Sequence, residues 1–463
     1  MSTVTVSDTP YVGSDRLLVG IVLSVLTFWL FAQSVINVVP AMKSSLDISL
    51  ETLTLAVSLS ALFSGCFVVA SGGLADKFGR MRMTTLGLGL SIVGSAMLVL
   101  AQGPGLFLAG RVLQGLSAAC IMPATLALIK TWYQGRARQR AVSFWVIGSW
   151  GGSGLCSFVG GAIATGLGWR WIFVFSIAVA LAALALLRGT PESRSASASQ
   201  QKLDVGGLLS LIVGLVLVNL FISKGHGWGW SSPLSLSMLA GALIAGAVFI
   251  RSGLRKGEAA LIDFALFRNR AYGAAVLSNF LLNGAIGTMM IASIWLQQGH
   301  HLTPLESGMM TLGYLVTVLA MIRVGEKLLQ RYGARLPMMA GPVLTAIAIA
   351  LISCTFLDKA LYIGVVFGSN VLFGLGLGCY ATPSTDTAVA NAPENKIGVA
   401  SGIYKMGSSL GGAMGIAVTA SLFALFLPLG MAHAAQYALW FNAALCLGAM
   451  AVSALLLPRA SHS

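Results

Sequence analysis

The chain consists of long apolar stretches that alternate with short polar loops. A helix of about twenty apolar residues crosses the hydrocarbon core of a bilayer, so each stretch predicts one membrane-spanning helix. The runs are continuous and do not alternate with a period of two, which excludes a transmembrane β-barrel. Fourteen spans are predicted in this way, at 17–38, 52–72, 83–102, 105–130, 141–164, 170–188, 205–223, 234–252, 271–295, 304–323, 337–356, 361–385, 398–425 and 435–457.

The basic residues indicate how these spans are oriented. An even number of spans places both termini on one side, where the loops hold 22 Lys and Arg residues, against four in the opposite loops. Loops rich in Lys and Arg remain in the cytoplasm, so both termini are predicted to be cytoplasmic. The net charge of +14 is therefore a topology signal, and a nucleic acid is not an expected partner.

Composition narrows the function classes further. Hydrophobic residues make up 57% of the chain and charged residues 9%, whereas a soluble protein is about one quarter charged. The six cysteines lie in apolar stretches without CxxC or Cys/His spacing, which predicts buried apolar residues and no metal site. The sequence has no GxxxxGK[ST] motif. We therefore expect no ATP hydrolysis, no enzyme activity and no cofactor.

An internal repeat divides the chain into two halves. Residues 111–115 (RVLQG) match residues 370–374 (NVLFG) at an offset of 259, and Gly79 aligns with Gly333 at an offset of 254. Parallel duplicated halves are typical of secondary transporters. The predicted domains are a six-helix half, a segment with a linker, two inserted helices and an amphipathic loop, and a second six-helix half, at 1–188, 189–270 and 271–463.

Several stretches resemble motifs of the major facilitator superfamily. GGLADKFGRMR at 72–82 is similar to its loop after span two, residues 111–115 to its span-four arginine motif, and the glycine-rich span five to its antiporter motif. LTFWLFAQS at 26–34 and ATPSTDTAVANAP at 381–393 are most similar to the Nor-type quinolone exporters of the fourteen-helix drug:proton antiporter family. The resemblance implies an all-α polytopic fold with fourteen transmembrane helices arranged 6+2+6. It also implies a location in a bacterial cytoplasmic membrane and a proton gradient as the energy source.

The loop after span two is a candidate conformational switch formed by Gly73, Asp76, Gly79 and Arg80. A carboxylate that neighbouring arginines keep ionised can cap the N-terminus of a helix. The resemblance implies that Asp76 contacts the start of span thirteen near Gly398 and thereby locks the outward-facing state. The alternative is a positively charged loop that contains one incidental acid.

Arg111 and Gln114 form a second candidate site, one turn apart in span four. A charge inside a span costs ~2.5–3.5 kcal/mol on insertion scales and is usually functional or paired. The resemblance implies a role in proton coupling. A guanidinium stays protonated at ordinary pH, so we expect Arg111 to tune a carboxylate or to hold water. The alternative is a structural arginine bonded to carbonyl groups.

Glycines in span five allow close packing and bending against the opposite half. The antiporter-motif positions are Gly148, Gly152, Gly160 and Gly161. Cys156-Ser157 stands where the family pattern has Gly-Pro, so the sequence leaves open how sharply this helix bends. The alternative is tight packing without a role in transport.

The few acidic residues decide which group carries the proton. Many relatives have an aspartate in span one, but the matching residue here is Ala32. Asp386 near the cytoplasmic end of span twelve and Lys405 in span thirteen are expected at similar depth. They are predicted to pair, as an inner gate or as the titrating element, and a purely structural pair is the alternative. Glu326 is predicted to form a surface pair with Arg323.

Aromatic and amide residues predict an adaptable drug-binding pocket. Its predicted lining includes Trp29 and the residues Phe28, Phe31, Gln33, Asn37, Trp145, Trp150, Asn279, Asn283 and Tyr404. The alternative is that most of these side chains face lipid or neighbouring helices. The scarcity of acids within the spans favours zwitterionic or weakly charged drugs over dications.

Together these features predict a monomeric, proton-driven exporter of amphipathic drugs, such as quinolones or cationic biocides, that works by alternating access. One alternative is an exporter of an endogenous metabolite, such as an amino acid, a siderophore or a lipid-like compound. Another is a membrane sensor that does not transport.

Overall fold

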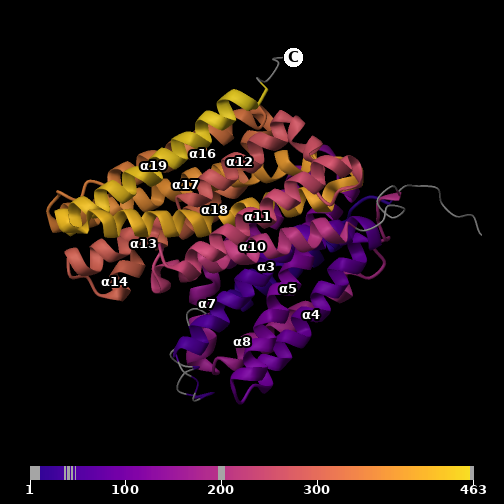
Figure 1. Cartoon of the computed structure of the whole chain (residues 1–463), viewed down its shortest axis with the longest axis horizontal. Coiled ribbons are helices and arrows are strands. Elements are labelled where there is room, and N and C mark those ends of the chain that lie inside the picture. The colour runs from indigo at the N-terminus through magenta and orange to yellow at the C-terminus, as the bar shows by residue number, and fades with distance from the viewer. Residues whose placement is uncertain are drawn as a thin grey trace, which may run out of the picture.

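The computed structural model describes residues 11–35, 38, 42, 45–46, 48, 50–196 and 204–458, and these residues form helices and no strands. The helices form two bundles, one from each half of the chain (Figure 1). The bundles converge at the end of the molecule that carries both described chain ends. There the Gly13 N–H donates to the carbonyl of Trp132, and Leu457 lies close to Asp386. We call this end the chain-end face.

The first bundle begins with an irregular span. Helix α1 (Asp15–Leu26) continues into a π-helical turn, η1 (Thr27–Phe31), and a 3₁₀ turn, η2 (Ala32–Ser34). The other helices of this half are α3 (Leu50–Phe78), α4 (Arg80–Leu100), α5 (Pro104–Trp132), α6 (Gly135–Val146), η3 (Ile147–Gly151), α7 (Gly152–Gly166) and α8 (Arg170–Leu187).

Two inserted helices and a loop separate the bundles, and the second bundle then follows. The insert contains α10 (Val205–Trp228), α11 (Pro233–Lys256), η4 (Gly257–Ala259) and η5 (Phe264–Arg268). The second bundle contains α12 (Arg270–Gly284), α13 (Gly287–Ile294), η6 (Trp295–Gly299), α14 (Pro304–Met309), α15 (Leu312–Tyr332), α16 (Arg335–Ile352), α17 (Lys359–Ala390), η7 (Glu394–Lys396), α18 (Ile397–Phe426), η8 (Leu427–Leu429) and α19 (Met431–Leu456).

Most of these helices have the length and apolarity of membrane spans. Within the described residues twelve helices qualify, and a thirteenth qualifies when the bent pair Gly135–Cys156 and Phe158–Gly166 is taken as one span. A shorter apolar helix occupies Val205–Val218 in the insert. The protein is therefore a multi-pass, all-helical membrane protein with about twelve apolar spans, and the count of fourteen stays a prediction.

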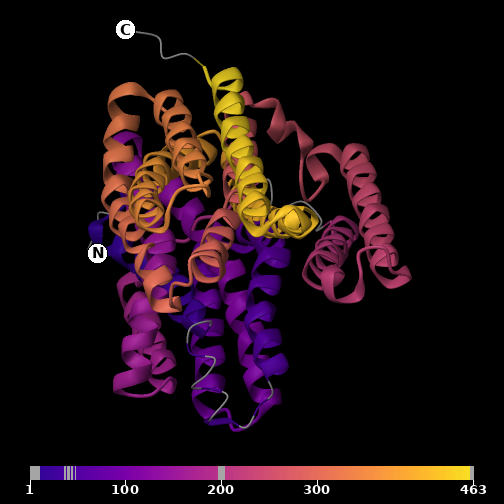
Figure 2. The same ribbon diagram turned by 90° about the vertical axis from the view of Figure 1, so that its left-hand side faces the viewer.

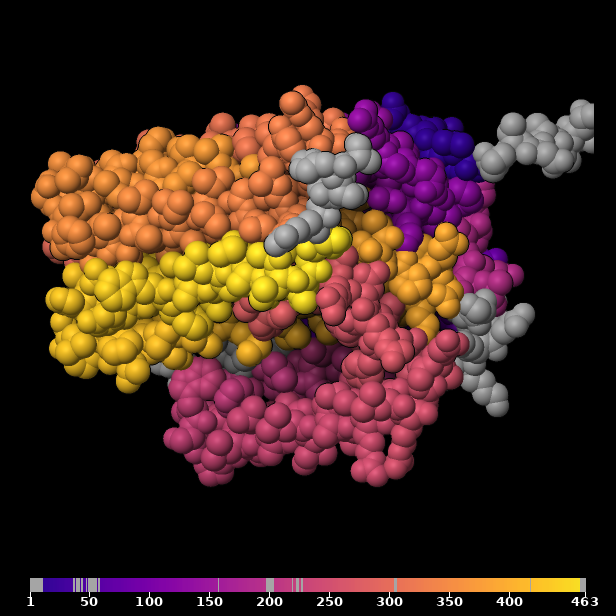
Figure 3. Space-filling model, turned by 90° about the horizontal axis from the view of Figure 1, so that it is seen from above, coloured from indigo at the N-terminus to yellow at the C-terminus, as the bar shows by residue number. Residues whose placement is uncertain are grey.

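The inserted helices form a hairpin on the outside of the bundles (Figures 2 and 3). Helix α10 packs against α3 and α18, and α11 packs against α10. In the loop that follows α11, Ile262 and Leu266 are buried, so the predicted amphipathic segment turns apolar side chains toward the protein.

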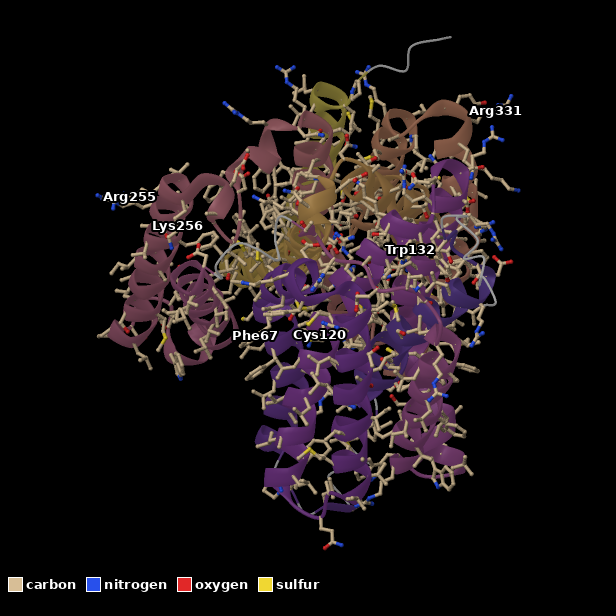
Figure 4. All side chains as sticks on the ribbon, turned by 90° about the vertical axis from the view of Figure 1, so that its right-hand side faces the viewer. Phe67, Cys120, Trp132, Arg255, Lys256 and Arg331 are labelled. Carbon is tan, nitrogen blue, oxygen red and sulfur yellow. The ribbon has the colours of Figure 1, made fainter. Side chains whose placement is uncertain are left out.

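Asp204 anchors this hairpin at its base. Its carboxylate accepts hydrogen bonds from the N–H groups of Gly207 (2.9 Å) and Leu261 (3.2 Å) and from the ammonium of Lys256 (2.5 Å). Burial raises the pKa of Asp204, but the bonds from Lys256, Gly207 and Leu261 outweigh it and hold the pKa below its ordinary value. In Figure 4, Arg255 points away from the bundles, whereas Lys256 lies closer to them.

A second ion pair connects the same loop to the start of α18. Lys396, which directly precedes α18, donates to the carboxylate of Asp263 (3.2 Å) and to the carbonyl of Glu258 (3.1 Å). The insert is thus held at its base by Asp204 and is tied to the second half by Lys396.

We predict that Asp204→Ala lowers the apparent melting temperature of the purified protein by more than Asp358→Ala does. Asp358 also caps a helix, through the N–H of Leu361, and losing a cap alone costs about 0.5–2 kcal/mol. Asp204→Ala additionally leaves Lys256 without its carboxylate. Equal melting temperatures for the two variants would contradict this role for Asp204.

The loss of thermal stability caused by Asp204→Ala should disappear only at acidic pH. The pKa of Asp204 is lowered by folding, so its contribution is complete above the ordinary Asp pKa of about 3.9 and is lost as the pH falls through the lower folded value. The difference in melting temperature is therefore expected to stay constant from roughly pH 5 to 8. A difference that already disappears at pH 6 would contradict this assignment.

Candidate functional site

Asp76 caps a helix that belongs to the opposite half. Its buried carboxylate accepts hydrogen bonds from the N–H groups of Gly398 (2.9 Å) and Val399 (3.1 Å), in the first turn of α18. Arg80 pairs with the same carboxylate at 3.1 Å. An anion at a helix N-terminus satisfies unpaired N–H groups and is favoured by the helix dipole. The structure therefore contains the contact that the sequence predicted between Asp76 and the start of span thirteen.

Glycines bring the two helix backbones together beside this cap. A Cβ atom on Gly72 would lie 2.2 Å from the carbonyl oxygen of Gly398, and one on Gly398 would lie 2.3 Å from the carbonyl oxygen of Gly72. Gly73 faces the inserted loop, since its Cβ would lie 3.0 Å from Leu261. Gly79 has a φ of +125° and forms the turn between α3 and α4, a conformation that side chains disfavour.

Three cations of the first half, Arg80 among them, bind the second half at the chain-end face. Arg80 donates to the carbonyl of Glu394 at 3.0 Å. Lys130, at the end of α5, donates to the carbonyls of Ala390 (3.1 Å) and Ala392, where a cation is favoured at the C-terminus of α17. Arg138 pairs with Asp386 at 2.9 Å. We call Asp76, Arg80, Lys130, Arg138 and their partners in 386–399 the interhalf gate.

The predicted pair of Asp386 and Lys405 does not form. Asp386 is paired with Arg138 of α6, and within the described part of the chain no carboxylate oxygen lies within 4.0 Å of Lys405. The reason is that Asp386 lies at the end of α17 nearest the first half, where the α6 arginine reaches it. The Lys405 ammonium instead lies 5.3 Å from the ring centre of Trp29 and 5.2 Å from that of Trp145.

Glu326 pairs with Arg323, as predicted, but it is not a surface residue. Its side chain is only 5% exposed and also accepts a hydrogen bond from Gln330 at 3.1 Å. All three residues belong to α15, so this ion pair and this hydrogen bond lie within one helix. Asp386 also lines an open cavity of about 460 Å³, together with Ala271, Tyr332, Gly333, Arg335, Thr387 and Leu457.

Arg111 is fully buried and makes four hydrogen bonds. It donates to the carbonyls of Ala32 (2.7 Å) and Ala56 (3.0 Å), to the Oε1 of Gln114 (2.7 Å) and to the Oγ of Ser60 (2.6 Å). The expected sharing of one network by Arg111 and Gln114 is present. The bond to the carbonyl of Ala32 connects span one to this network.

Span five bends despite the absence of the family's proline. The helical pair on either side of Ser157 is bent by 51°, and η3 adds a π-helical turn before it. Two of the predicted glycines make close contacts within the first half: a Cβ on Gly152 would lie 3.1 Å from Trp29, and one on Gly160 would lie 2.6 Å from Ser34. A Cβ on Gly148 would make an ordinary contact, and one on Gly161 would meet nothing within 4 Å.

Two other glycines of span five face the opposite half. A Cβ on Gly151 would lie 2.6 Å from Leu319, and one on Gly154 would lie 2.4 Å from Leu315. Both leucines belong to α15. The glycine-rich sequence indicated close packing between the halves, but the motif positions alone did not identify which glycines make it.

The predicted pocket residues divide into two groups. Trp145, together with Trp29, flanks Lys405. Most of the others serve the packing of their own half: Phe28 and Phe31 are core residues, and the Asn279 amide donates to the carbonyl of Tyr404 (3.1 Å) and the Oγ of Ser408 (2.6 Å).

The remaining predicted pocket residues have the following positions. Asn283 donates to the Oδ1 of Asn279 at 2.9 Å. Tyr404 bonds through its hydroxyl to Ser384 (3.0 Å) and Thr385 (3.1 Å). Gln33 and Trp150 are half-buried, and Asn37 lies outside the described residues.

Comparisons with known proteins agree with this architecture. The family model described as Major Facilitator Superfamily matches residues 17–267 and 272–463. The quinolone resistance protein NorB of Staphylococcus aureus strain MRSA252 is 50% identical over 448 residues, which are 96% of this chain and 96% of NorB. NorB of strain MW2 has the same identity and coverage.

Solved structures show the same fold at low sequence identity. The proton:xylose symporter XylE, bound to 6-bromo-6-deoxy-D-glucose, matches with a TM-score of 0.67 and 15% identity, covering 96% of both chains. The human organic anion transporter MFSD10 matches with a TM-score of 0.63 and 16% identity, covering 95% of this chain and 98% of MFSD10. With its two joined bundles, its Asp76 helix cap and these matches, the chain belongs to the major facilitator superfamily.

Proposed function

We propose that this protein is a proton-coupled multidrug antiporter that exports amphipathic drugs, quinolones among them, by alternating access. The observation that carries the proposal is the interhalf gate, in which charged side chains of the first half hold the ends of α17 and α18 at a single face. Such a gate gives the two halves contacts that can be made and broken as one unit. The likeness to NorB supports drugs as the substrate class.

The proposed orientation places the chain-end face in the cytoplasm, with fourteen spans arranged 6+2+6 and both termini cytoplasmic. The excess of Lys and Arg in the loops of that side supports this orientation. In this arrangement the closed interhalf gate corresponds to the outward-facing state. Opening the gate would expose the substrate site to the bacterial cytoplasm, and we propose that one chain suffices for the cycle.

Asp386 is the proposed site where protonation acts on the gate. Protonation would remove the negative charge that holds Arg138, and a buried charge left without its partner is destabilising. A net exchange requires the proton to reach Asp386 from the outside while the gate is closed, along the interface between the halves. The gate would then open toward the cytoplasm, where the proton is released and the drug enters. Arg111 and Gln114 keep a fixed network in this scheme, which holds span one against α3 and α5.

The first prediction concerns export itself. Expression in a host without its own drug exporters is expected to lower the accumulation of a fluoroquinolone, because the protein moves the drug outward against its gradient. Fluorescence of the cell-associated drug measures this, and a protonophore should remove the difference from cells with an empty vector. Accumulation that is equal with and without the protein would contradict the proposed function.

The second prediction concerns the proton. Asp386→Asn mimics a permanently protonated carboxyl, so it should reduce drug transport driven by an imposed pH gradient in proteoliposomes. A reduction of about tenfold is expected, since coupling energies in proteins commonly correspond to roughly 5–150-fold effects.

Glu326→Gln is the matched control for Asp386→Asn. It removes a similarly buried carboxylate whose partners, Arg323 and Gln330, lie on its own helix. Transport by Glu326→Gln should stay close to that of the wild type. Full activity of Asp386→Asn at every pH would remove this residue from the mechanism.

The third prediction concerns the closed gate. Gly72→Ala should shift the population toward states in which the chain-end face is open, because the added methyl group overlaps the Gly398 carbonyl. Gly65→Ala on the same helix is the control, since its methyl group would meet Ser409 at an ordinary 3.8 Å. Distances between spin labels at residues 82 and 331, in a variant without the native cysteines, report the change. Identical distance distributions for both variants would contradict the role of this contact.

A further inference from the structure

Lys405 extends from the second half to two tryptophans of the first half. It lies on α18, and its ammonium is about equally distant from the rings of Trp29 and Trp145, at 5.3 and 5.2 Å. The Nε1 of Trp145 donates to the Oγ1 of Thr125 at 2.9 Å, and the Nε1 of Trp29 donates to the Sδ of Met122 at 3.4 Å. These bonds fix both indoles to α5, so the two rings form a preformed aromatic cage around the ammonium.

The cage leaves the charge of Lys405 without a counter-ion. Asp386 is used by Arg138, and the ion pairs of the described residues do not include Lys405. Cation–π contacts with the two indoles stabilise this desolvated ammonium in part. A buried charge nevertheless remains costly until an opposite charge and further hydrogen bonds satisfy it. An anionic group that reaches this position is therefore attracted to it.

Lys405 lies at the point along α18 where the residues that face the first half change from buried to exposed. Gly402, one turn closer to the interhalf gate, is packed against the backbone of Val68, and Lys405 is 9% exposed. Ser409, one turn farther from the gate, is exposed and still faces Gly65 of α3. Trp29, which contacts the Lys405 ammonium, is half-buried. A molecule that enters between the halves from the side opposite the chain-end face would therefore reach Lys405 last, just above the closed gate.

We propose that Lys405, with Trp29 and Trp145, is a receptor for the carboxylate of aromatic acids and zwitterions, which forms the acidic part of the substrate site. The carboxylate would pair with the ammonium, and the adjoining aromatic ring would contact an indole face. This inference rests on the proposed function, because it names the substrate class of that exporter. Drugs that carry only a positive charge gain nothing from Lys405.

Binding to the purified protein at pH 7 tests this assignment without requiring transport. The probes are an aromatic drug with a free carboxylate, such as a fluoroquinolone, and the methyl ester of the same drug. The wild type is expected to bind the acid about tenfold more tightly than the ester, as expected for one charge-assisted hydrogen bond. Quenching of tryptophan fluorescence reports binding.

Three variants complete the test. Lys405→Gln should remove the preference for the acid, and Lys405→Arg should keep it because the charge remains. Lys359→Gln, which neutralises an exposed lysine at the start of α17, is the matched control and should also keep it. Melting temperatures identify any variant that fails to fold, and the comparison of acid with ester in the wild type needs no variant.

Several outcomes would overturn the proposal: equal affinity of the wild type for acid and ester, binding of neither compound, or an undiminished preference in Lys405→Gln. Failure of the efflux assay would count against export and leave the binding result standing. If the protein prefers the acid but does not export it, the carboxylate receptor is supported and the proposed export is contradicted.

Discussion

Hydrocarbon offers no hydrogen bonds, so every charge and every free backbone group of this protein needs a partner within the protein or a position near water. Arg111 meets this constraint with two backbone carbonyls and two side-chain oxygens, all in its own half. Asp76 and Lys130 meet it across the halves, at the two ends of helices whose N–H and carbonyl groups are otherwise unpaired. The strongest polar contacts between the halves therefore gather at helix ends on one face.

The sequence predicts that the two halves are copies of one repeat, but they contribute different chemistry to this face. The first half supplies a negative and a positive charge: a carboxylate for the N-terminus of α18 and a lysine for the C-terminus of α17. The second half supplies mainly backbone groups and one acid, Asp386. Asn370, which takes the place of Arg111 in the second copy, carries no charge. The gate therefore contains one carboxylate from each half, and each has different partners.

Much of this architecture follows from local pattern. The predicted span 83–102 corresponds to α4, Arg80–Leu100. A stretch of about twenty mainly apolar residues has the length that a helix needs to cross the bilayer. The contact of Asp76 with α18 was expected from the resemblance of its loop to a known motif. The pair of Arg138 and Asp386 was not expected. The two residues are 248 positions apart, and the sequence around neither residue indicates the other as its partner. The cage of Lys405 was missed for the same reason: similar depth suggested a carboxylate partner, but the docking of the two halves placed two indoles there.

The inserted hairpin has a mechanical consequence. Its base is joined to residue 396, immediately before α18, through the loop that carries Glu258 and Asp263. Any movement that displaces the start of α18 must therefore drag this loop and the hairpin through the surrounding lipid, or first break these bonds. Movement of the hairpin in the bilayer is thus coupled to movement of the start of α18. In the proposed cycle, membrane thickness and lateral pressure, which act on the apolar surface of the hairpin, would contribute to the work of opening the gate.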